Sequence, residues 1–205
     1  MGPSADHQAP LAVYPWPVSR QLIAAIATAD TALIVISIAT SVSTARNVAR
    51  IQLRQAVLEM LSLRLGLPPY AIVLNCTPGQ AMRVNLTGHQ IRLSASHERG
   101  ISLAAIHQSG PVGIDVVRIP PAFDWQQIAR DYLGPHALAR IVNLAQSEQM
   151  PAFACEWSRL EARLKCLGLG LQEWSMALES RMQACYTVEI DLPLGLVGCC
   201  AVLRL

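Results

Sequence analysis

The chain has 205 residues, of which 52% are hydrophobic and 15% are charged, and its mean hydropathy is +0.34. This length fits one domain or two small, closely packed halves, and the apolar content is ample for a core. The net charge is +2, and the basic residues are scattered without interleaved aromatic residues, so nothing indicates nucleic-acid binding. The low charge content hints at an exposed apolar patch or an oligomer.

The first 20 residues are rich in Pro and Ala and predict a loose N-terminal segment without an export signal. Residues 22–42 are apolar over a length that could cross a bilayer. However, Asp30 lies near the middle, where a charge costs roughly 2.5–3.5 kcal/mol on insertion scales. The Ala-rich part before Asp30 is typical of a helix and the β-branched part after it of a strand. We therefore predict a short helix and a buried strand rather than a membrane span.

After a strand near Ala32–Ala39, residues 44–69 carry apolar side chains at helical spacing, and Gly66 with Pro68 and Pro69 ends this helix.

Three arginines repeat every fourth residue along that predicted helix: Arg46, Arg50 and Arg54. Residues four apart lie on the same face of a helix. This row is either a solvated face or a row that faces an anion, and the spacing alone is compatible with both.

Short apolar runs follow, and their close spacing predicts strands in an antiparallel meander. They cover residues 71–76, 91–96, 100–107 and 111–119. Helical patterns return at Trp125–Leu133, His136–Ala145 and Ala154–Leu167, and the apolar runs at 184–192 and 195–205 predict a closing hairpin. The order of helices and strands predicts an α+β fold.

The cysteines match no zinc-binding spacing, because no C-x-x-C occurs and no pair of histidines lies nearby. They are Cys76, Cys155, Cys166, Cys185, Cys199 and Cys200. We interpret them as buried free thiols of a cytoplasmic protein.

Two strand positions are candidates for chemistry. Asp115 lies within the apolar run VGIDVV, where a carboxylate is costly unless it is paired, hydrogen-bonded or bound to a cation. His97 follows Ser96 at the end of a predicted strand, where it is either an ordinary turn residue or, together with the hydroxyl, a phosphate-binding group.

Charged residues concentrate on the helical pattern between Glu156 and Leu171. Trp157, Glu161 and Lys165 are four apart and share one face. An ordinary Glu161–Lys165 pair within the helix is worth a few tenths of a kcal/mol and is one explanation of this face. The other explanation is a site that holds a metal and an anion.

The order of these motifs resembles the 4′-phosphopantetheinyl transferase family, specifically the longer, monomeric type that activates peptide and polyketide synthetases. The resemblance rests on LSASH at 93–97, VGIDV at 112–116 and WSRLEARLKCLGLGL at 157–171. It implies two pseudo-symmetric α/β halves, each a helix packed on a small antiparallel sheet, with coenzyme A bound between them. We expect the halves to cover residues 21–106 and 107–205.

The resemblance also implies a function and roles for the candidate residues. The family transfers the 4′-phosphopantetheine arm of coenzyme A to a serine of an apo carrier protein and releases 3′,5′-ADP. By resemblance, Asp115 and Glu161 would hold Mg²⁺, and Glu161 would be the candidate base. Lys165 would contact phosphate, and Ser96 with His97 would meet the 3′-phosphate. Trp157 would shape the site, and Arg46 or Arg54 would supply an anion contact. No membrane or nucleic-acid partner is implied.

The chain departs from the family pattern at three positions. Val117 replaces a second acidic residue, Leu160 replaces a lysine, and Ala137 or His136 stands where another acidic residue is expected. These departures motivate an alternative, namely a degenerate relative that binds coenzyme A or a carrier protein without efficient transfer. A third interpretation is an unrelated α+β domain in which Asp115 and Glu161 lie far apart.

Overall fold

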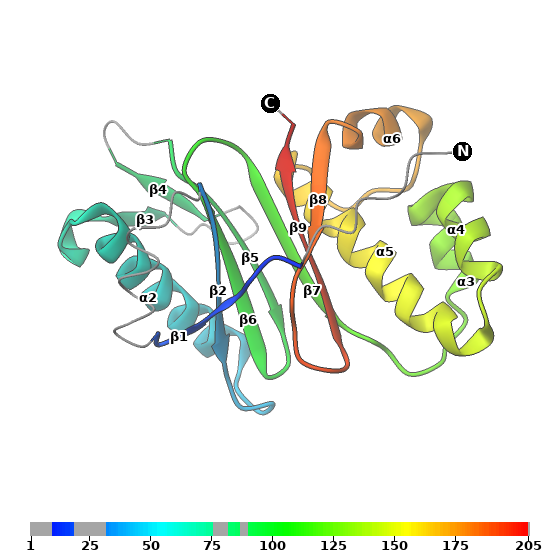
Figure 1. Ribbon diagram of the computed structural model, residues 1–205, viewed down its shortest axis with the longest axis horizontal. Coiled ribbons are helices and arrows are strands. Elements are labelled where there is room, and N and C mark those ends of the chain that lie inside the picture. The colour runs from blue at the N-terminus through cyan, green and yellow to red at the C-terminus, as the bar shows by residue number, and fades with distance from the viewer. Residues whose placement is uncertain (1–9, 19–31, 76–81, 87–89, 205) are drawn as a thin grey trace.

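The computed structural model describes residues 10–18, 32–75, 82–86 and 90–204. Its two sheets lie next to each other, with helices at the two outer sides of the molecule (Figure 1). This arrangement confirms the predicted α+β fold of helices packed on antiparallel sheets. The predicted helix before Asp30 lies outside the described residues. No described helix is long and apolar enough to span a membrane.

The first sheet has the strand order β1-β2-β6-β5-β4-β3. Its pairs are antiparallel except for β1 with β2. The elements of this half are β1 (Tyr14–Trp16), β2 (Leu33–Ala39), α2 (Arg46–Leu65), a 3₁₀ turn (Pro69–Ala71), β3 (Val73–Asn75), β4 (Arg83–Asn85), β5 (Arg92–Glu98) and β6 (Ile101–His107). The sequence, which predicts a loose segment over residues 1–20, carried no signal for β1.

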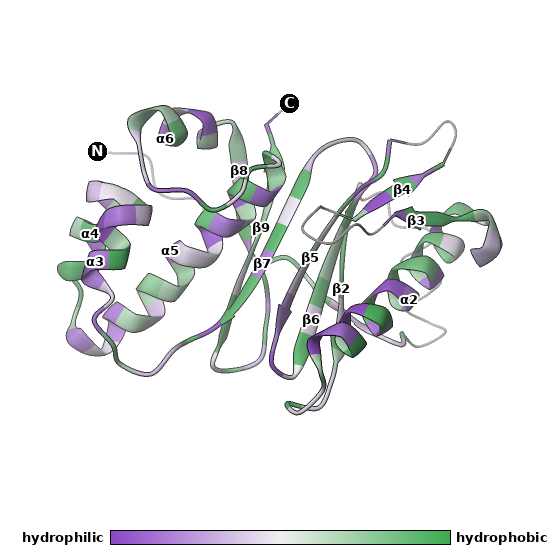
Figure 2. Cartoon of the chain, turned by 180° about the vertical axis from the view of Figure 1, so that it is seen from behind, coloured by the Kyte–Doolittle hydropathy of each residue, from purple (hydrophilic) through white to green (hydrophobic). Residues whose placement is uncertain are grey.

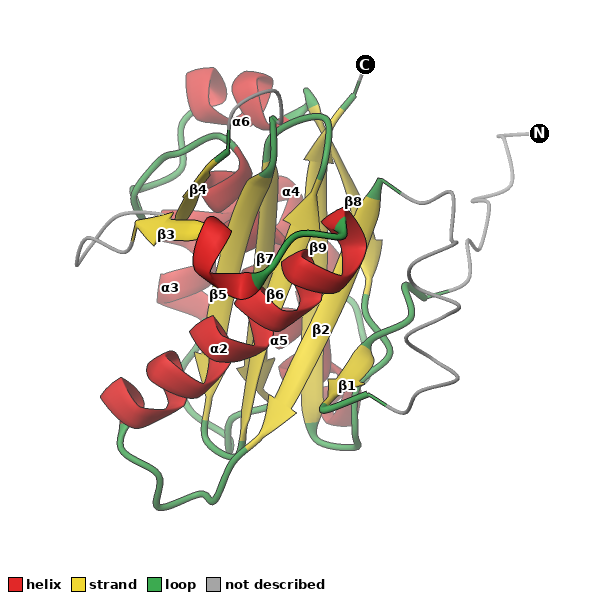
Figure 3. Cartoon of the chain, turned by 90° about the vertical axis from the view of Figure 1, so that its left-hand side faces the viewer, coloured by secondary structure: helices red, strands yellow, loops and turns green. Residues whose placement is uncertain are grey.

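Helix α2 covers one face of this sheet (Figure 3). Its apolar positions, including Leu53, Val57 and Leu61, are buried against Ile34 and Ile36 of β2. The helix ends as predicted, because Gly66 adopts the left-handed conformation with φ of 65°. The spacing of the apolar residues therefore predicted this helix and its end. It predicted the buried face only in part, because Val48 and Ile51 are exposed.

The second sheet is antiparallel and has the order β7-β9-β8. The elements of this half are β7 (Val112–Arg118), α3 (Gln126–Ile128), a π-helical turn (Ala129–Leu133), α4 (Gly134–Val142), α5 (Gln146–Cys166), α6 (Met176–Met182), β8 (Cys185–Glu189) and β9 (Leu196–Leu203). The hairpin of β8 and β9 confirms the predicted closing pair. Helix α5 begins earlier than predicted, and α6 was not predicted.

Strand β2 explains the apolar run that resembles a membrane span. Ile34 and Ile36 face α2, whereas Val35 packs in a different cluster with Ile114 and Val116 of β7. Because alternate residues of a strand point to opposite faces, a strand buried on both faces reads as a continuous apolar run. The apolar residues of this segment thus fill the core and the contact between the two halves.

Strand β7 leaves the predicted meander and begins the second sheet. Its free edge is covered by serine side chains of β5, because the N–H groups of Ile114 and Val116 donate to Ser94 Oγ at 3.0 Å and Ser96 Oγ at 3.2 Å. An edge strand needs such partners for its unpaired backbone groups. These side-chain bonds hold β5 and β7 side by side and set Asp115 next to Ser96.

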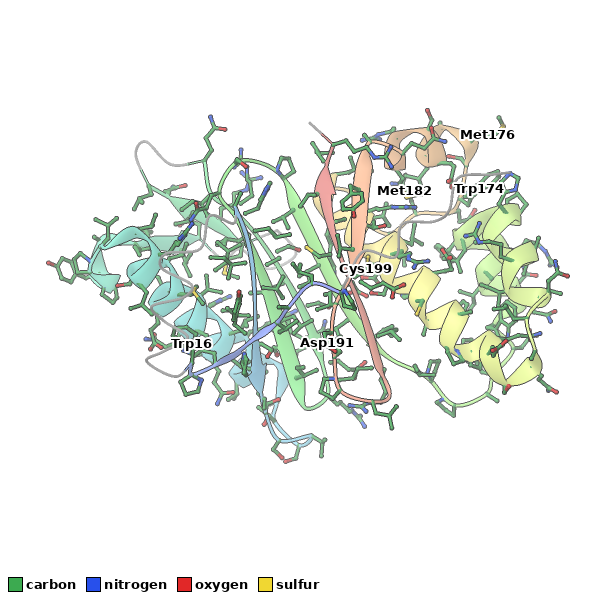
Figure 4. The ribbon with its side chains drawn as sticks, viewed as in Figure 1. Trp16, Trp174, Met176, Met182, Asp191 and Cys199 are labelled. Atoms are coloured by element: carbon green, nitrogen blue, oxygen red, sulfur yellow. The ribbon has the colours of Figure 1, made fainter. Side chains whose placement is uncertain are left out.

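The cysteines that the structure describes are free, and all except Cys155 are buried. Cys199 lies on β9 near α5 (Figure 4), and burial raises its pKa to about 12. Such thiols stay protonated at neutral pH. The prediction of buried free thiols is confirmed for Cys166, Cys185, Cys199 and Cys200, whereas Cys155 is free but only partly buried. Cys76 lies outside the described part of the chain.

Candidate functional site

A cleft of about 710 Å³ opens between the two helices α2 and α5, over strands β5 and β7. Figure 2 shows α2 and α5 on opposite sides of these neighbouring strands. The lining residues with charged or polar side chains are Arg46, Arg50, Arg54, Arg83, Ser94, Ser96, His97, Asp115, Trp157, Glu161 and Lys165. All the site residues predicted from the sequence therefore line one cleft, including those that are more than 100 positions apart in the chain.

Asp115 is the most deeply buried charged group of the cleft, with a side chain only 7% exposed. Its Oδ1 accepts hydrogen bonds from Ser96 Oγ at 2.8 Å and from Lys165 Nζ at 2.7 Å. Ser158 on α5 donates to its backbone oxygen at 3.2 Å. Burial raises the pKa of Asp115, and the positive charge of Lys165 acts in the opposite direction. The buried carboxylate is thus paired and hydrogen-bonded, as its apolar surroundings require.

The predicted face of α5 points into the cleft. Trp157 Nε1 donates to Glu161 Oε1 at 3.2 Å, and Glu161 Oε2 lies 3.5 Å from Lys165 Nζ. Trp157 also packs edge-on against Tyr132, with ring centroids 5.8 Å apart. The intrahelical pair proposed as the ordinary explanation is present, but Lys165 also reaches across to Asp115. The two carboxylates therefore converge on one cation position.

The close approach of α5 to β7 makes this convergence possible. A stripe of small residues, Ala154, Ser158, Ala162 and Cys166, is buried on α5. Opposite this stripe lies Gly113, where a Cβ atom would overlap the carbonyl oxygen of Ala162. Two residues after Gly113 on the same face of β7 comes Asp115. The glycine of VGIDV thus lets the helix bring Glu161 and Lys165 within reach of the aspartate.

His97 lies at the end of β5, and its Nδ1 is 2.8 Å from Ser102 Oγ. Burial, followed by the positive charges of Arg50, Arg46, Lys165 and Arg54, lowers the pKa of His97 from 6.5 to about 4. The imidazole is therefore neutral at pH 7. A neutral ring can donate one N–H to an anion without adding to the positive charge of the free cleft.

The lowered pKa of His97 predicts a loss of stability in mild acid. The unfolded chain takes up a proton near pH 6.5, whereas the folded protein resists it until about pH 4. The free energy of unfolding should consequently fall as the pH drops through this window. In urea titrations at pH 7 and pH 5, we expect His97→Gln to lose less stability between the two pH values than the unsubstituted protein. An equal loss in both proteins would contradict this assignment.

The arginine row of α2 lines the cleft, although its side chains are exposed. With Arg83 and Lys165, the cleft carries five basic side chains against two carboxylates. This excess of positive charge favours a polyanionic ligand. Arg54 thus lines the same cleft as the carboxylates of α5 and β7, and its exposed side chain is compatible with solvent as well as with a bound anion.

Residues 111–188 match the family model of the 4′-phosphopantetheinyl transferase superfamily. The match covers Asp115, Glu161 and Lys165 but not Ser96, His97 or the arginines of α2. It supports the family resemblance for the second half of the chain, without establishing the longer monomeric type. Comparison with curated proteins found no match.

The departures from the family pattern have different structural settings. Val117 lines the cleft near Asp115, so the absent third carboxylate would have belonged to the site. Leu160 instead packs in the apolar cluster of Phe153 and Leu164. No group of three or more His, Cys, Asp or Glu residues that could hold a metal occurs in the described part of the chain.

The donor set nevertheless fits a divalent metal. Asp115 and Glu161 already share one cation, the ammonium of Lys165, at 2.7 and 3.5 Å. Mg²⁺ is commonly bound by one or two carboxylates, with waters and substrate phosphates at the other positions. A two-carboxylate site beside a basic cleft meets this description.

Two serines that support the site were not predicted from the sequence. Ser94 holds β7 in place, and Ser158 binds the backbone oxygen of Asp115. Both serines are buried in the structure, where a hydroxyl needs a hydrogen-bonding partner, but their sequence neighbours do not reveal that burial. The partner itself was not predictable, because it lies on a distant segment. Ser96 was expected to meet a phosphate, whereas in the structure its hydroxyl donates to Asp115.

Proposed function

We propose that this protein transfers the 4′-phosphopantetheine arm of coenzyme A to a serine of an apo carrier protein, with Mg²⁺, and releases 3′,5′-ADP. We also propose that it acts as a cytoplasmic monomer of the type that activates peptide and polyketide synthetases. The observation that carries the proposal is the convergence of Asp115 and Glu161 on one cation position. The match of residues 111–188 to the transferase superfamily supports it.

The positive charge of the cleft complements the negative charge of coenzyme A. Coenzyme A carries a pyrophosphate and a 3′-phosphate, and the cleft has an excess of basic side chains. In our proposal His97 and Arg54 bind the 3′-phosphate, and Trp157 shapes the wall beside the pyrophosphate. Ser96 holds Asp115 in place through its 2.8 Å hydrogen bond. The ligand would thus span the two halves, from α2 to α5.

The proposed reaction is attack by the serine hydroxyl of the carrier on the phosphorus next to the pantetheine arm. The new bond joins the serine oxygen to this phosphorus, and the broken bond is that to the bridging oxygen, which leaves with 3′,5′-ADP. Mg²⁺ held by Asp115 and Glu161 would neutralise the pyrophosphate oxygens. Glu161 accepts the serine proton, and Lys165 stabilises the charge that develops on the leaving group.

A second candidate function is binding of coenzyme A or a carrier protein without efficient transfer. Its motivation is Val117, which places an apolar side chain on the cleft where the family has a carboxylate. A metal held by one acidic residue fewer would bind less tightly. The two functions differ in whether modified carrier accumulates when coenzyme A binds.

Glu161→Gln provides the test, with Glu156→Gln as its matched control. Both residues lie on α5, but Glu156 pairs with Arg140 and Arg159 away from the cleft. We expect Glu161→Gln to slow transfer to an apo carrier by about 10²–10⁴-fold, the usual contribution of a general base. Glu156→Gln should retain the rate within about twofold, because Glu156 does not line the cleft. The measurement is the rate at which a fluorescent coenzyme A derivative labels the carrier.

Calorimetry with coenzyme A separates the two candidate functions. Binding without labelling by the unsubstituted protein, across several carriers, would favour the binding function. Equal labelling rates in Glu161→Gln and Glu156→Gln would contradict the role of Glu161.

A further inference from the structure

Lys165 fills the position between the two carboxylates of the cleft. Its Nζ lies 2.7 Å from Asp115 Oδ1 and 3.5 Å from Glu161 Oε2, and it also donates to the backbone oxygen of Ile114 at 3.1 Å. An ammonium from the chain itself therefore lies beside both carboxylates and offsets one of their two negative charges. Since Oδ1 of Asp115 also accepts from Ser96, this oxygen is fully engaged.

We propose that Lys165 is a resident counter-cation, which a divalent metal must displace from Asp115 before it can bind. The inference rests on the proposed function, because that function supplies the metal and its two ligands. An ammonium at 2.7 Å from Asp115 Oδ1 and a divalent ion on the same carboxylate would repel each other strongly in a partly buried site. Metal and Lys165 consequently compete for Asp115.

The side chain of Lys165 has somewhere to go when it is displaced. It lines the cleft, is 30% exposed, and ends a flexible four-carbon stem. A phosphate group bound in the cleft could then form an ion pair with the ammonium of Lys165 in place of Asp115. Metal and phosphate would therefore bind cooperatively, because each removes an obstacle to the other. Without a phosphate ligand the metal would bind weakly. Lys165 would thus make tight metal binding depend on a phosphate ligand in the cleft.

The test is Mn²⁺ binding by the full chain at pH 8, followed by the electron paramagnetic resonance of free Mn²⁺. We expect Lys165→Met to bind Mn²⁺ at least about tenfold more tightly than the unsubstituted protein. In this variant the Lys165–Asp115 ion pair no longer has to be broken before the metal binds. If Lys165→Met folds poorly, Lys165→Gln replaces it in the experiment, because the amide can still donate hydrogen bonds to Asp115 or Ile114. We expect the same increase in Mn²⁺ affinity for this variant. Arg181→Met removes an exposed charge on α6 that does not line the cleft, and it should match the unsubstituted protein.

Pyrophosphate provides the second arm of the experiment. It should raise the Mn²⁺ affinity of the unsubstituted protein by a larger factor than that of Lys165→Met. The double variant Asp115→Asn with Lys165→Met should lose the tight binding, which assigns the metal to this site.

The possible failures are distinguishable. Equal Mn²⁺ affinities in the unsubstituted protein, Lys165→Met and Lys165→Gln would overturn the displacement by metal but leave the metal site intact. Absence of Mn²⁺ binding in all of them, even with pyrophosphate, would overturn the metal site on which the proposed function depends.

Discussion

Asp115→Asn is expected to abolish transfer while leaving the protein folded. Asn keeps the size of the side chain but removes the negative charge that would hold the metal. A loss of several kcal/mol of charge stabilisation corresponds to about a thousandfold decrease in rate. The initial rate of carrier labelling at saturating coenzyme A measures this loss. Asp191→Asn is the control, because Asp191 is exposed and does not line the cleft.

The stability of Asp115→Asn provides a second, independent expectation. Burial raises the pKa of Asp115, so the folded protein favours the protonated form more than the unfolded chain does. Ionised Asp115 therefore lowers the free energy of unfolding as the pH rises through the raised pKa. Neutral Asn avoids this desolvation cost, and we expect a Tm at pH 7 that is no lower than that of the unsubstituted protein. A large drop in Tm would mean that Asp115 acts as a structural ion-pair partner of Lys165.

Gly113→Ala is expected to cause the largest loss of stability of any substitution considered. A Cβ atom there would overlap the carbonyl oxygen of Ala162 and lie 2.5 Å from the backbone nitrogen of Cys166. Both contacts are with helix backbone, which has no rotamer to change. Helix α5 would have to move off β7, at a cost of about 3 kcal/mol or more. Thermal unfolding followed by circular dichroism measures the effect.

Gly170→Ala is the matched control for Gly113→Ala. A Cβ atom at Gly170 would meet no other atom within 4 Å, so we expect a change in stability within about 0.5 kcal/mol. Similar Tm values for the two alanine variants would contradict the close contact between α5 and β7. Because that contact brings Glu161 close to Asp115, the same result would also count against the proposed site.

Local sequence patterns predicted those helices and strands whose residue spacing is recognisable within a single segment. The apolar spacing up to Leu65 and the stop at Gly66 predicted helix α2, although Val48 and Ile51 of that pattern are exposed. Four-residue spacing placed Glu161 and Lys165 on one face of α5. The cost of a carboxylate in an apolar strand predicted a partner for Asp115. That partner, Lys165, was itself among the candidates, although as a phosphate ligand.

Features that depend on distant segments were not predictable in the same way. Strand β7 pairs with β9 in the second sheet, and Ser94 and Ser96 satisfy its other edge. No local pattern distinguishes these serines from exposed ones. The spacing of the arginine row of α2 favoured a solvated face over an anion-facing one, and only the fold showed that the row lines the same cleft as Glu161. Strand β1 is only three residues long, and its pairing with β2 is a tertiary contact.

The central claim is that the carboxylates on β7 and α5 serve metal-dependent transfer of phosphopantetheine. Intact-mass spectrometry of an apo acyl or peptidyl carrier protein, incubated with this protein, coenzyme A and Mg²⁺, tests it most directly. The account predicts that the carrier gains one phosphopantetheine and that a chelator prevents the gain. An unchanged carrier mass across fatty-acid, polyketide and peptide carriers, with coenzyme A bound to the protein, would contradict it.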